Sequence, residues 1–214
     1  MTIKLFCNSV GTRKVPNPNS DNNYPIFPEL IKSEIYYSLL VSGTWNHIKD
    51  MNLENDIVIF NVGINDCVFR KDRGIQIPLL VGLINESESI HDDVTIRLAS
   101  KKIFDLTYKS PDKLIQLLTF HEFDKYLDMI FKKVDKGIVL SVLWFSPDAP
   151  KMGYAYNEII QINSILQHQA IKHKLIYIDL FHPPVLTFDD VHLTKEGHEV
   201  VAKKIKKAIT AMFK

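Results

Sequence analysis

Two residues near the carboxyl end of the chain, Asp189 and His192, have types and spacing suited to acid–base catalysis. A carboxylate three residues before a histidine can hydrogen-bond one ring nitrogen, which fixes the tautomer and leaves the other nitrogen free to act as a base. A serine hydroxyl is a poor nucleophile at neutral pH and needs such a base within hydrogen-bonding distance. Ser9, at the end of the first apolar segment, is the candidate nucleophile. Ser9, Asp189 and His192 are therefore predicted to form a catalytic triad.

Acyl transfer also requires hydrogen-bond donors for the oxyanion of the tetrahedral intermediate. The sequence offers three candidates, which are the backbone N–H groups of Ser9 and Gly43 and the side-chain amide of Asn65. Glycine at position 43 suits a close approach of the backbone to a substrate. The predicted oxyanion hole therefore consists of Ser9, Gly43 and Asn65.

The triad residues also have ordinary structural interpretations. A serine after a strand is most often a cap or turn residue, and Asp189 could form a turn with Asp190. Asp190 also competes to orient His192, although a spacing of two residues makes that contact less natural. The triad interpretation is favoured because candidates for nucleophile, base and oxyanion donors occur in one chain.

The remaining polar candidates have structural interpretations. His198, one turn into the last helix, is predicted to pack or cap, and Asp66 is predicted to stabilise the turn that presents Asn65. The cluster at residues 91–93 (His-Asp-Asp) could suggest a metal site, but no second group of ligands at regular spacing accompanies it, so we interpret it as a loop. The residue pattern therefore predicts no metal site at this cluster.

Apolar segments that alternate with helical patterns indicate how these residues are positioned. Strands separated by helices predict an α/β fold with a parallel sheet and helices on both faces. In such folds the reactive groups lie beyond the carboxyl ends of the strands. All of the candidate site residues follow predicted strands. The strands are expected at 3–7, 37–41, 56–62, 137–145 and 175–180, and the helices at 29–36, 44–51, 94–106, 111–134, 157–173 and from 195 onward.

Size and composition restrict the class of protein. The chain has 214 residues, 46% of them hydrophobic, and a formal net charge of +1. This predicts one domain, residues 1–214, with an insertion at about 67–110, and argues against nucleic acid as a partner. The sequence shows no signal peptide and no run of about 18 apolar residues, so we expect a cytoplasmic protein without a membrane span. Cys7 and Cys67 are interpreted as reduced, buried thiols.

Taken together, the motifs resemble those of the SGNH (GDSL-type) hydrolase superfamily. The matching segments are Gly63-Ile64-Asn65-Asp66 after an apolar strand, Asp189-Asp190-Val191-His192-Leu193, and the pair Gly197-His198. The resemblance implies a flavodoxin-like three-layer α/β/α sandwich with a central parallel sheet, and hydrolysis or transfer of ester-linked acyl groups. It also implies that Ser9 is the nucleophile, that Gly43 and Asn65 are oxyanion donors, and that Asp189 and His192 complete the triad. No cofactor is implied.

The first block of the family pattern differs in this chain. The family usually has Gly-Asp-Ser, whereas this sequence has Cys7-Asn8-Ser9. Asn8 can hydrogen-bond locally as an aspartate does, but it brings no charge. This departure motivates one alternative, a non-catalytic binding module that retains the fold.

The leading interpretation is a serine esterase that removes a small acyl group, such as acetyl, from a polar small-molecule substrate such as a sugar ester. Trp45, Tyr24 and Trp144 could stack on a sugar ring if they line the cleft, although core packing is the expected role of Trp144. A second alternative keeps the triad but changes the acceptor. If the insertion at 67–110 excludes water, a substrate hydroxyl would resolve the acyl-enzyme, which gives an O-acyltransferase. The sequence does not indicate which oligomeric state the protein has.

Overall fold

The computed structural model describes residues 2–8, 23–38, 40–63, 66, 118–142, 156–180, 187 and 192–214. These residues form a five-stranded, all-parallel sheet with the strand order β2-β1-β3-β4-β5. This is the strand order of flavodoxin-like doubly wound folds. The strands are β1 (Ile3–Cys7), β2 (Glu34–Tyr37), β3 (Ile57–Asn61), β4 (Gly137–Leu140) and β5 (Ile176–Ile178).

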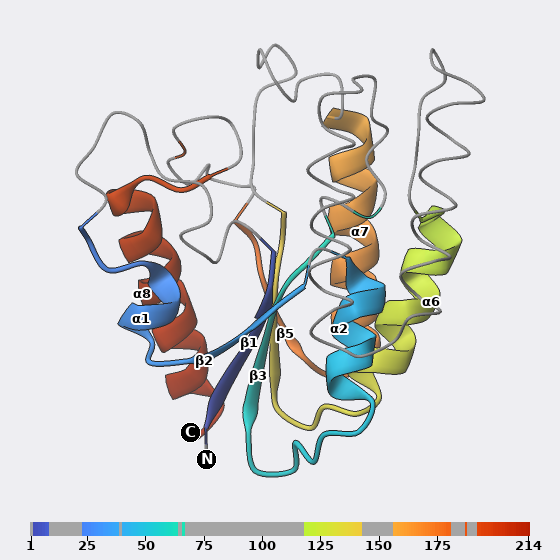
Figure 1. The fold of residues 1–214 in the computed structure, drawn as a ribbon, viewed down its shortest axis with the longest axis horizontal. Coiled ribbons are helices and arrows are strands. Elements are labelled where there is room, and N and C mark those ends of the chain that lie inside the picture. Colours follow the sequence, from blue (N-terminus) through green and yellow to red (C-terminus); the bar gives the residue numbers. More distant parts are fainter. Residues whose placement is uncertain are drawn as a thin grey trace.

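Helices cover both faces of the sheet (Figure 1). One face carries α1 (Phe27–Leu30) and α8 (Lys195–Ala211), and the other carries α2 (Val41–Ile48), α6 (Phe120–Phe131) and α7 (Tyr156–Lys172). The fold is therefore a three-layer α/β/α sandwich, as the sequence predicts. None of the helices in the described residues is both long and apolar enough to span a membrane.

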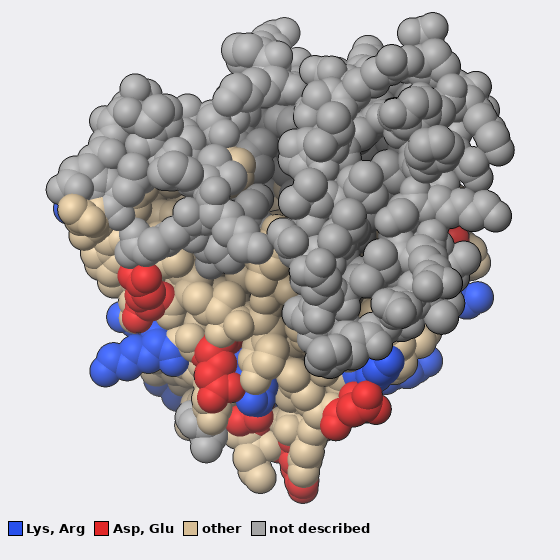
Figure 2. All heavy atoms as spheres, viewed as in Figure 1, with Lys and Arg blue, Asp and Glu red and all other residues tan. Residues whose placement is uncertain are grey.

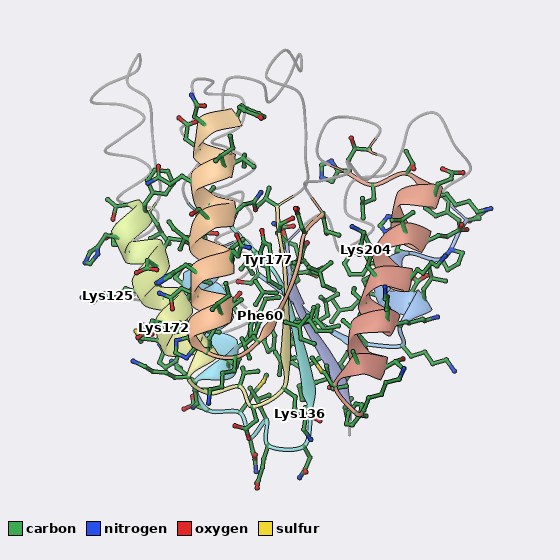
Figure 3. The ribbon with its side chains drawn as sticks, turned by 180° about the vertical axis from the view of Figure 1, so that it is seen from behind. Phe60, Lys125, Lys136, Lys172, Tyr177 and Lys204 are labelled. Carbon is green, nitrogen blue, oxygen red and sulfur yellow. The ribbon has the colours of Figure 1, made fainter. Side chains whose placement is uncertain are left out.

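The core divides into two layers because the side chains of each strand alternate between the faces of the sheet. Every residue of β3 is buried, as expected of a central parallel strand. Val58 and Phe60 pack on the side of α2, α6 and α7, whereas Ile57 and Ile59 pack on the side of α1 and α8. Figure 3 shows Phe60 and Tyr177 between the sheet and α7. Burial raises the pKa of Tyr177 to about 12.

The chain between residues 26 and 41 folds differently from the sequence prediction. The helix predicted at 29–36 ends at Leu30, because Lys32 adopts a left-handed conformation with a φ of 56°. The N–H of Ser33 then donates to the carbonyl oxygen of Pro28 (3.0 Å), and that of Lys32 donates to Glu29 (3.1 Å). These two bonds form a Schellman closure, which releases the chain into an extended strand.

The strand that follows, β2, spans Glu34–Tyr37 rather than the predicted 37–41. Among the described strands it pairs with β1 alone, and Lys4 lies opposite Glu34 with an ion pair of 2.9 Å between them. Helix α2 consequently begins at Val41 instead of residue 44. Gly43 therefore lies within the first turn of this helix and not in the loop before it.

The other predicted elements agree more closely with the structure. β1 matches its predicted range, β3 and β5 are shorter at both ends, and β4 ends at Leu140 instead of continuing toward residue 145. α7 and α8 begin within one residue of their predicted starts, and α6 forms part of the region predicted at 111–134. The segment at 67–110, with the helix predicted at 94–106, lies outside the described residues.

Charged side chains form local pairs on the described surface. On the face shown in Figure 2, basic and acidic side chains are intermixed. Asp128 on α6 has three basic partners, and the distances from its carboxylate oxygens are 2.6 Å to Lys132, 2.7 Å to Lys172 and 2.8 Å to His173. These hydrogen bonds, led by that of Lys132, hold the pKa of Asp128 well below its usual range.

Candidate active site

The carboxyl ends of β1, β2 and β3 lie together at one edge of the sheet. The N–H of Asn8, directly after β1, donates to the carbonyl oxygen of Asn61 at the end of β3 (3.3 Å). The N–H of Ser38, directly after β2, donates to the carbonyl oxygen of Cys7 (2.8 Å). Between β1 and β3 the strand order reverses direction, and in open α/β sheets ligands bind beyond the strand ends at this position.

The start of helix α2 is joined to the segment that follows β3. The first N–H groups of a helix have no partner within the helix itself. In α2 the N–H of Val41, the first helical residue, donates to Oδ1 of Asp66 at 2.7 Å. The side chain of Asp66 is fully buried. Gly43, two residues further along the same turn, is therefore fixed relative to the Gly63–Asp66 segment.

Gly63 begins that segment and has to be a glycine for two reasons. Its φ is +120°, a conformation that other residues rarely adopt. A Cβ atom at this position would also lie 2.8 Å from Cγ2 of Ile162 and 3.2 Å from Cζ of Phe123. The turn after β3 therefore packs closely against α6 and α7.

Asp66 closes this turn through its backbone. Its N–H donates to the carbonyl oxygen of Gly63 (3.1 Å), and its own carbonyl oxygen accepts from the N–H of Leu118 (2.8 Å), just before α6. These bonds agree with the predicted role of Asp66 in stabilising the turn. The bond from its side chain to α2 is a further role that the sequence analysis missed, and no local pattern indicates it because Val41 lies 25 residues away.

His192 lies three residues before α8. Thr194 caps this helix, with its hydroxyl accepting from the N–H of Gly197 at 3.1 Å. Leu193 is buried and pairs with Thr187 through an antiparallel bridge, which joins the two ends of the segment that contains residues 189 and 192. Leu193 also belongs to the same core cluster as Cys7, two residues before Ser9. Leu193, next to His192, and Cys7, at the end of β1, are thus parts of one packed layer.

Two residues of the first turn of α8 have structural roles. Nδ1 of His198 accepts from the N–H of Phe27 at 3.3 Å, and the two rings stack with centroids 5.8 Å apart. His198 therefore caps α1 and packs against it, as predicted. The carboxylate of Glu196 is hydrogen-bonded to its own backbone N–H and to Thr194, which lowers its pKa and suits an acid at a helix N-terminus.

Two further polar residues that hydrogen-bond the chain after β4 and β5 were missed in the sequence analysis. The side-chain amide of Asn163 accepts from the N–H of Val142 (2.7 Å) and donates to its carbonyl oxygen (3.3 Å). Ser141 Oγ accepts from the N–H of Leu180 at 2.7 Å. Both side chains interrupt apolar patterns, on α7 and after β4, and that interruption is the only sequence signal they give. They fix the positions of the chain after β4 and β5.

The described residues contain part of the predicted site. Gly43 lies in the first turn of α2 and His192 is partly buried before α8. Ser9, Asn65 and Asp189 lie outside the described residues, as do Asp190, Cys67 and the cluster at 91–93, so the triad and the complete oxyanion hole remain predictions. Within the described part of the chain, no group of three or more His, Cys, Asp or Glu side chains is arranged to bind a metal ion.

The aromatic residues considered for sugar stacking have neighbours in the core. Trp45 is partly buried and packs against the core layer between the sheet and α2, α6 and α7. The ring of Tyr24 lies 6.0 Å from that of His198, centroid to centroid. Trp144 lies outside the described residues.

No protein-family model and no curated protein matches the chain. Solved structures do match along nearly its whole length. A lipase/acylhydrolase from Enterococcus faecalis is 13% identical with a TM-score of 0.58, covering 99% of this chain and 97% of that one. A GDSL-like lipase from Bacteroides thetaiotaomicron is 16% identical with a TM-score of 0.57, covering 99% and 88%. An acetylxylan esterase from Geobacillus stearothermophilus is 12% identical with a TM-score of 0.53, covering 97% and 94%. The chain therefore has the fold of the SGNH (GDSL-type) hydrolases, as its motifs predict.

Proposed function

We propose that this protein is a serine-dependent ester hydrolase that removes a small acyl group, with acetyl as the first candidate, from a polar substrate of the carbohydrate class. The observation that carries the proposal is the hydrogen bond from Val41 to Asp66 at the carboxyl edge of the sheet. It joins the helix turn that contains Gly43 to the residue next to Asn65, so two predicted oxyanion donors come from segments that are held together.

Two other observations support a triad at the same edge. The N–H of Asn8, next to Ser9 in the sequence, is bonded to the end of β3. Leu193, next to His192, shares a core cluster with Cys7. These contacts support the proposal that the segments predicted to carry nucleophile, base and oxyanion donors lie where open α/β sheets bind ligands.

The proposed reaction has two acyl-transfer steps. Ser9 Oγ attacks the acyl carbon while His192 accepts the hydroxyl proton, and Asp189 orients the imidazole. The backbone N–H groups of Ser9 and Gly43 and the amide of Asn65 stabilise the oxyanion. When the tetrahedral intermediate collapses, the ester C–O bond breaks and the alcohol leaves with the proton from His192. Water, deprotonated by His192, then attacks the acyl-enzyme, which releases the carboxylic acid and restores Ser9.

The substrate class is the finer part of the proposal. Among the structures that share the fold are several of one acetylxylan esterase from Geobacillus stearothermophilus, including a mutant described as an acetyl-xylooligosaccharide esterase and a catalytic mutant with serine replaced by alanine. This esterase is distant in sequence, so it supports acetylated sugars only as the first substrates to assay.

The test compares the wild type with Ser9→Ala in the release of p-nitrophenol from p-nitrophenyl acetate. Ser33→Ala is the matched control, since Ser33 precedes β2 at the opposite edge of the sheet and its hydroxyl bonds only the carbonyl oxygen of Pro28 within the described residues. We expect Ser9→Ala to lose at least about 1,000-fold in kcat and Ser33→Ala to retain full activity. Equal rates for wild type and Ser9→Ala would remove Ser9 from the mechanism.

Two further outcomes separate the alternatives. The protein would be an O-acyltransferase if the wild type, in the presence of a sugar acceptor, transfers acetyl to the sugar faster than it releases acetate. The protein would be a binding module if the folded wild type neither hydrolyses esters nor reacts with a fluorophosphonate probe at Ser9.

A further inference from the structure

Asp66 is a fully buried carboxylate that takes no part in the proposed proton transfers. Its hydrogen bonds join three segments of the molecule. The side chain accepts from Val41 at the start of α2, the N–H donates to Gly63, and the carbonyl oxygen accepts from Leu118 before α6. Of these three bonds, the one to Val41 is made by the side chain and can be removed without changing the backbone.

The bond to Val41 lies where it can set the geometry of the oxyanion hole. Val41 is the first residue of α2 and Gly43 is the third, so both N–H groups belong to the same helical turn. Asp66 directly follows Asn65 in the sequence. An oxyanion hole is effective only if its donors are preorganised, and misplacement by about 1 Å can lower a rate by about 100-fold.

A carboxylate also suits this position electrostatically. The N-terminus of a helix carries partial positive charge, so an acidic side chain there is favourable. No residue of the first turn of α2 is acidic, and its N-cap, Leu40, has no side chain that can cap the helix. The cap is therefore supplied by Asp66, from a segment distant in the sequence.

We propose that Asp66 is a positioning residue that holds Gly43 and Asn65 in register as oxyanion donors. This inference rests on the function proposed above. It predicts that loss of the bond between Val41 and Asp66 lowers kcat and leaves KM nearly unchanged, because the donors act on the transition state and contribute little to ground-state binding.

The first test removes or keeps the acceptor. Asp66→Ala removes it and should lower kcat for p-nitrophenyl acetate by about 10- to 100-fold, with KM within about 3-fold of the wild type. Asp66→Asn keeps an oxygen that can accept from Val41 and should recover kcat to within about 5-fold of the wild type. Rescue by asparagine is expected of a hydrogen-bond acceptor at this position and not of a residue that needs its charge for chemistry.

The second test removes the donor and leaves Asp66 in place. Val41→Pro deletes the N–H at the first helical position, where proline is tolerated. Leu40 has φ −123° and ψ 157°, an extended conformation that a following proline requires. Val41→Ala is the control for lost side-chain packing, since it keeps the N–H. We expect Val41→Pro to lower kcat as much as Asp66→Ala, and the double variant to be no worse than either, since both remove the bond between Val41 and Asp66.

A control for general destabilisation comes from the opposite end of the sandwich. Gln169 is buried near the end of α7, and its amide donates to Asp124 at 2.6 Å. Gln169→Met removes a partly buried hydrogen bond between α7 and α6 and should leave kcat unchanged. Urea unfolding of each variant, followed by far-UV circular dichroism, shows whether the assays contain folded protein.

The outcomes separate this inference from the proposed function. In one outcome Ser9→Ala is inactive, whereas Asp66→Ala and Val41→Pro are folded and have the same kcat as Gln169→Met. Asp66 then does not position the oxyanion hole, and the proposed function stands. Additive losses in the double variant, or an asparagine variant as slow as the alanine variant, also refute the positioning role. If Ser9→Ala is as active as the wild type, the proposed function and this inference fail together.

Discussion

Replacement of Gly63 by alanine should destabilise the protein through both the backbone and the side chain. The φ of Gly63 is +120°, and a residue with a Cβ atom held in such a conformation is strained by about 1–3 kcal/mol. The new methyl group would also lie 2.8 Å from Cγ2 of Ile162, closer than real Cβ contacts. Overpacking of this kind costs about 1–3 kcal/mol. The sum predicts a loss of about 2–6 kcal/mol in the free energy of unfolding.

Gly137 offers a control in which only the packing is disturbed. A Cβ at Gly137 would lie 2.9 Å from Cγ1 of Val134 and 3.1 Å from Cδ2 of Leu175, but its φ is outside the left-handed region. Alanine in place of either glycine lowers the entropy of the unfolded chain equally, so that effect cancels in the comparison. We therefore expect Gly63→Ala to cost about 1–3 kcal/mol more than Gly137→Ala, and this difference isolates the backbone strain.

The assay is urea unfolding at equilibrium, monitored by far-UV circular dichroism for wild type, Gly63→Ala and Gly137→Ala. The slope of the unfolding free energy against urea should be the same for all three, which allows the midpoints to be compared. If Gly63→Ala does not fold but Gly137→Ala does, the result agrees with the upper end of the range predicted for the loss of unfolding free energy. Equal midpoints for the two variants would refute the conclusion that Gly63 needs its left-handed conformation.

Two other predictions concern stability. His198→Phe should lower the free energy of unfolding by about 1–3 kcal/mol, because the buried N–H of Phe27 loses its acceptor while ring packing is kept; a urea midpoint equal to that of the wild type would contradict the capping role. Asp128 has a lowered pKa in the folded protein, so its stabilising effect is complete above about pH 5 and declines as the pH falls through its ordinary pKa of 3.8. Asp128→Asn should therefore lower the urea midpoint at pH 7. The difference in midpoint from the wild type should shrink between about pH 5 and pH 3. A difference that is constant with pH would show that the ion pairs do not cause it.

The central strands could be predicted because burial on both faces leaves a plain signal. β3 is apolar up to Asn61 and β1 is apolar apart from Lys4, and both lie inside the sheet. β2 was misplaced because it is an edge strand, in which Glu34 and Ile35 are exposed. Its sequence continues a helical pattern from α1, and the left-handed conformation of Lys32 that separates the two has no sequence signal, since lysine rarely adopts it.

The location of the candidate site could also be predicted, because it follows from topology. Candidate residues after the strands must lie at the carboxyl edge once the sheet is parallel. The contacts that tie these segments together were not predictable in the same way. Asp66 and Val41 are 25 residues apart, and a carboxylate after a glycine-containing turn has many structural uses. Only the register of β1 with β3 and the start of α2 bring these two groups to hydrogen-bonding distance.

Residues 63 and 66 connect the stability of the fold with the proposed chemistry through different forces. Gly63 is fixed by packing against α6 and α7, which is shared with the core, so a change there should lower the stability of the whole sandwich. Asp66 is joined to α2 by the hydrogen bond from Val41, and loss of this bond should displace the donors while most of the core stays intact. Activity that falls in proportion to the folded fraction therefore reports a packing defect. A fall in kcat in fully folded protein reports displaced donors, and this difference allows the two residues to be assigned separate roles even though they belong to one turn.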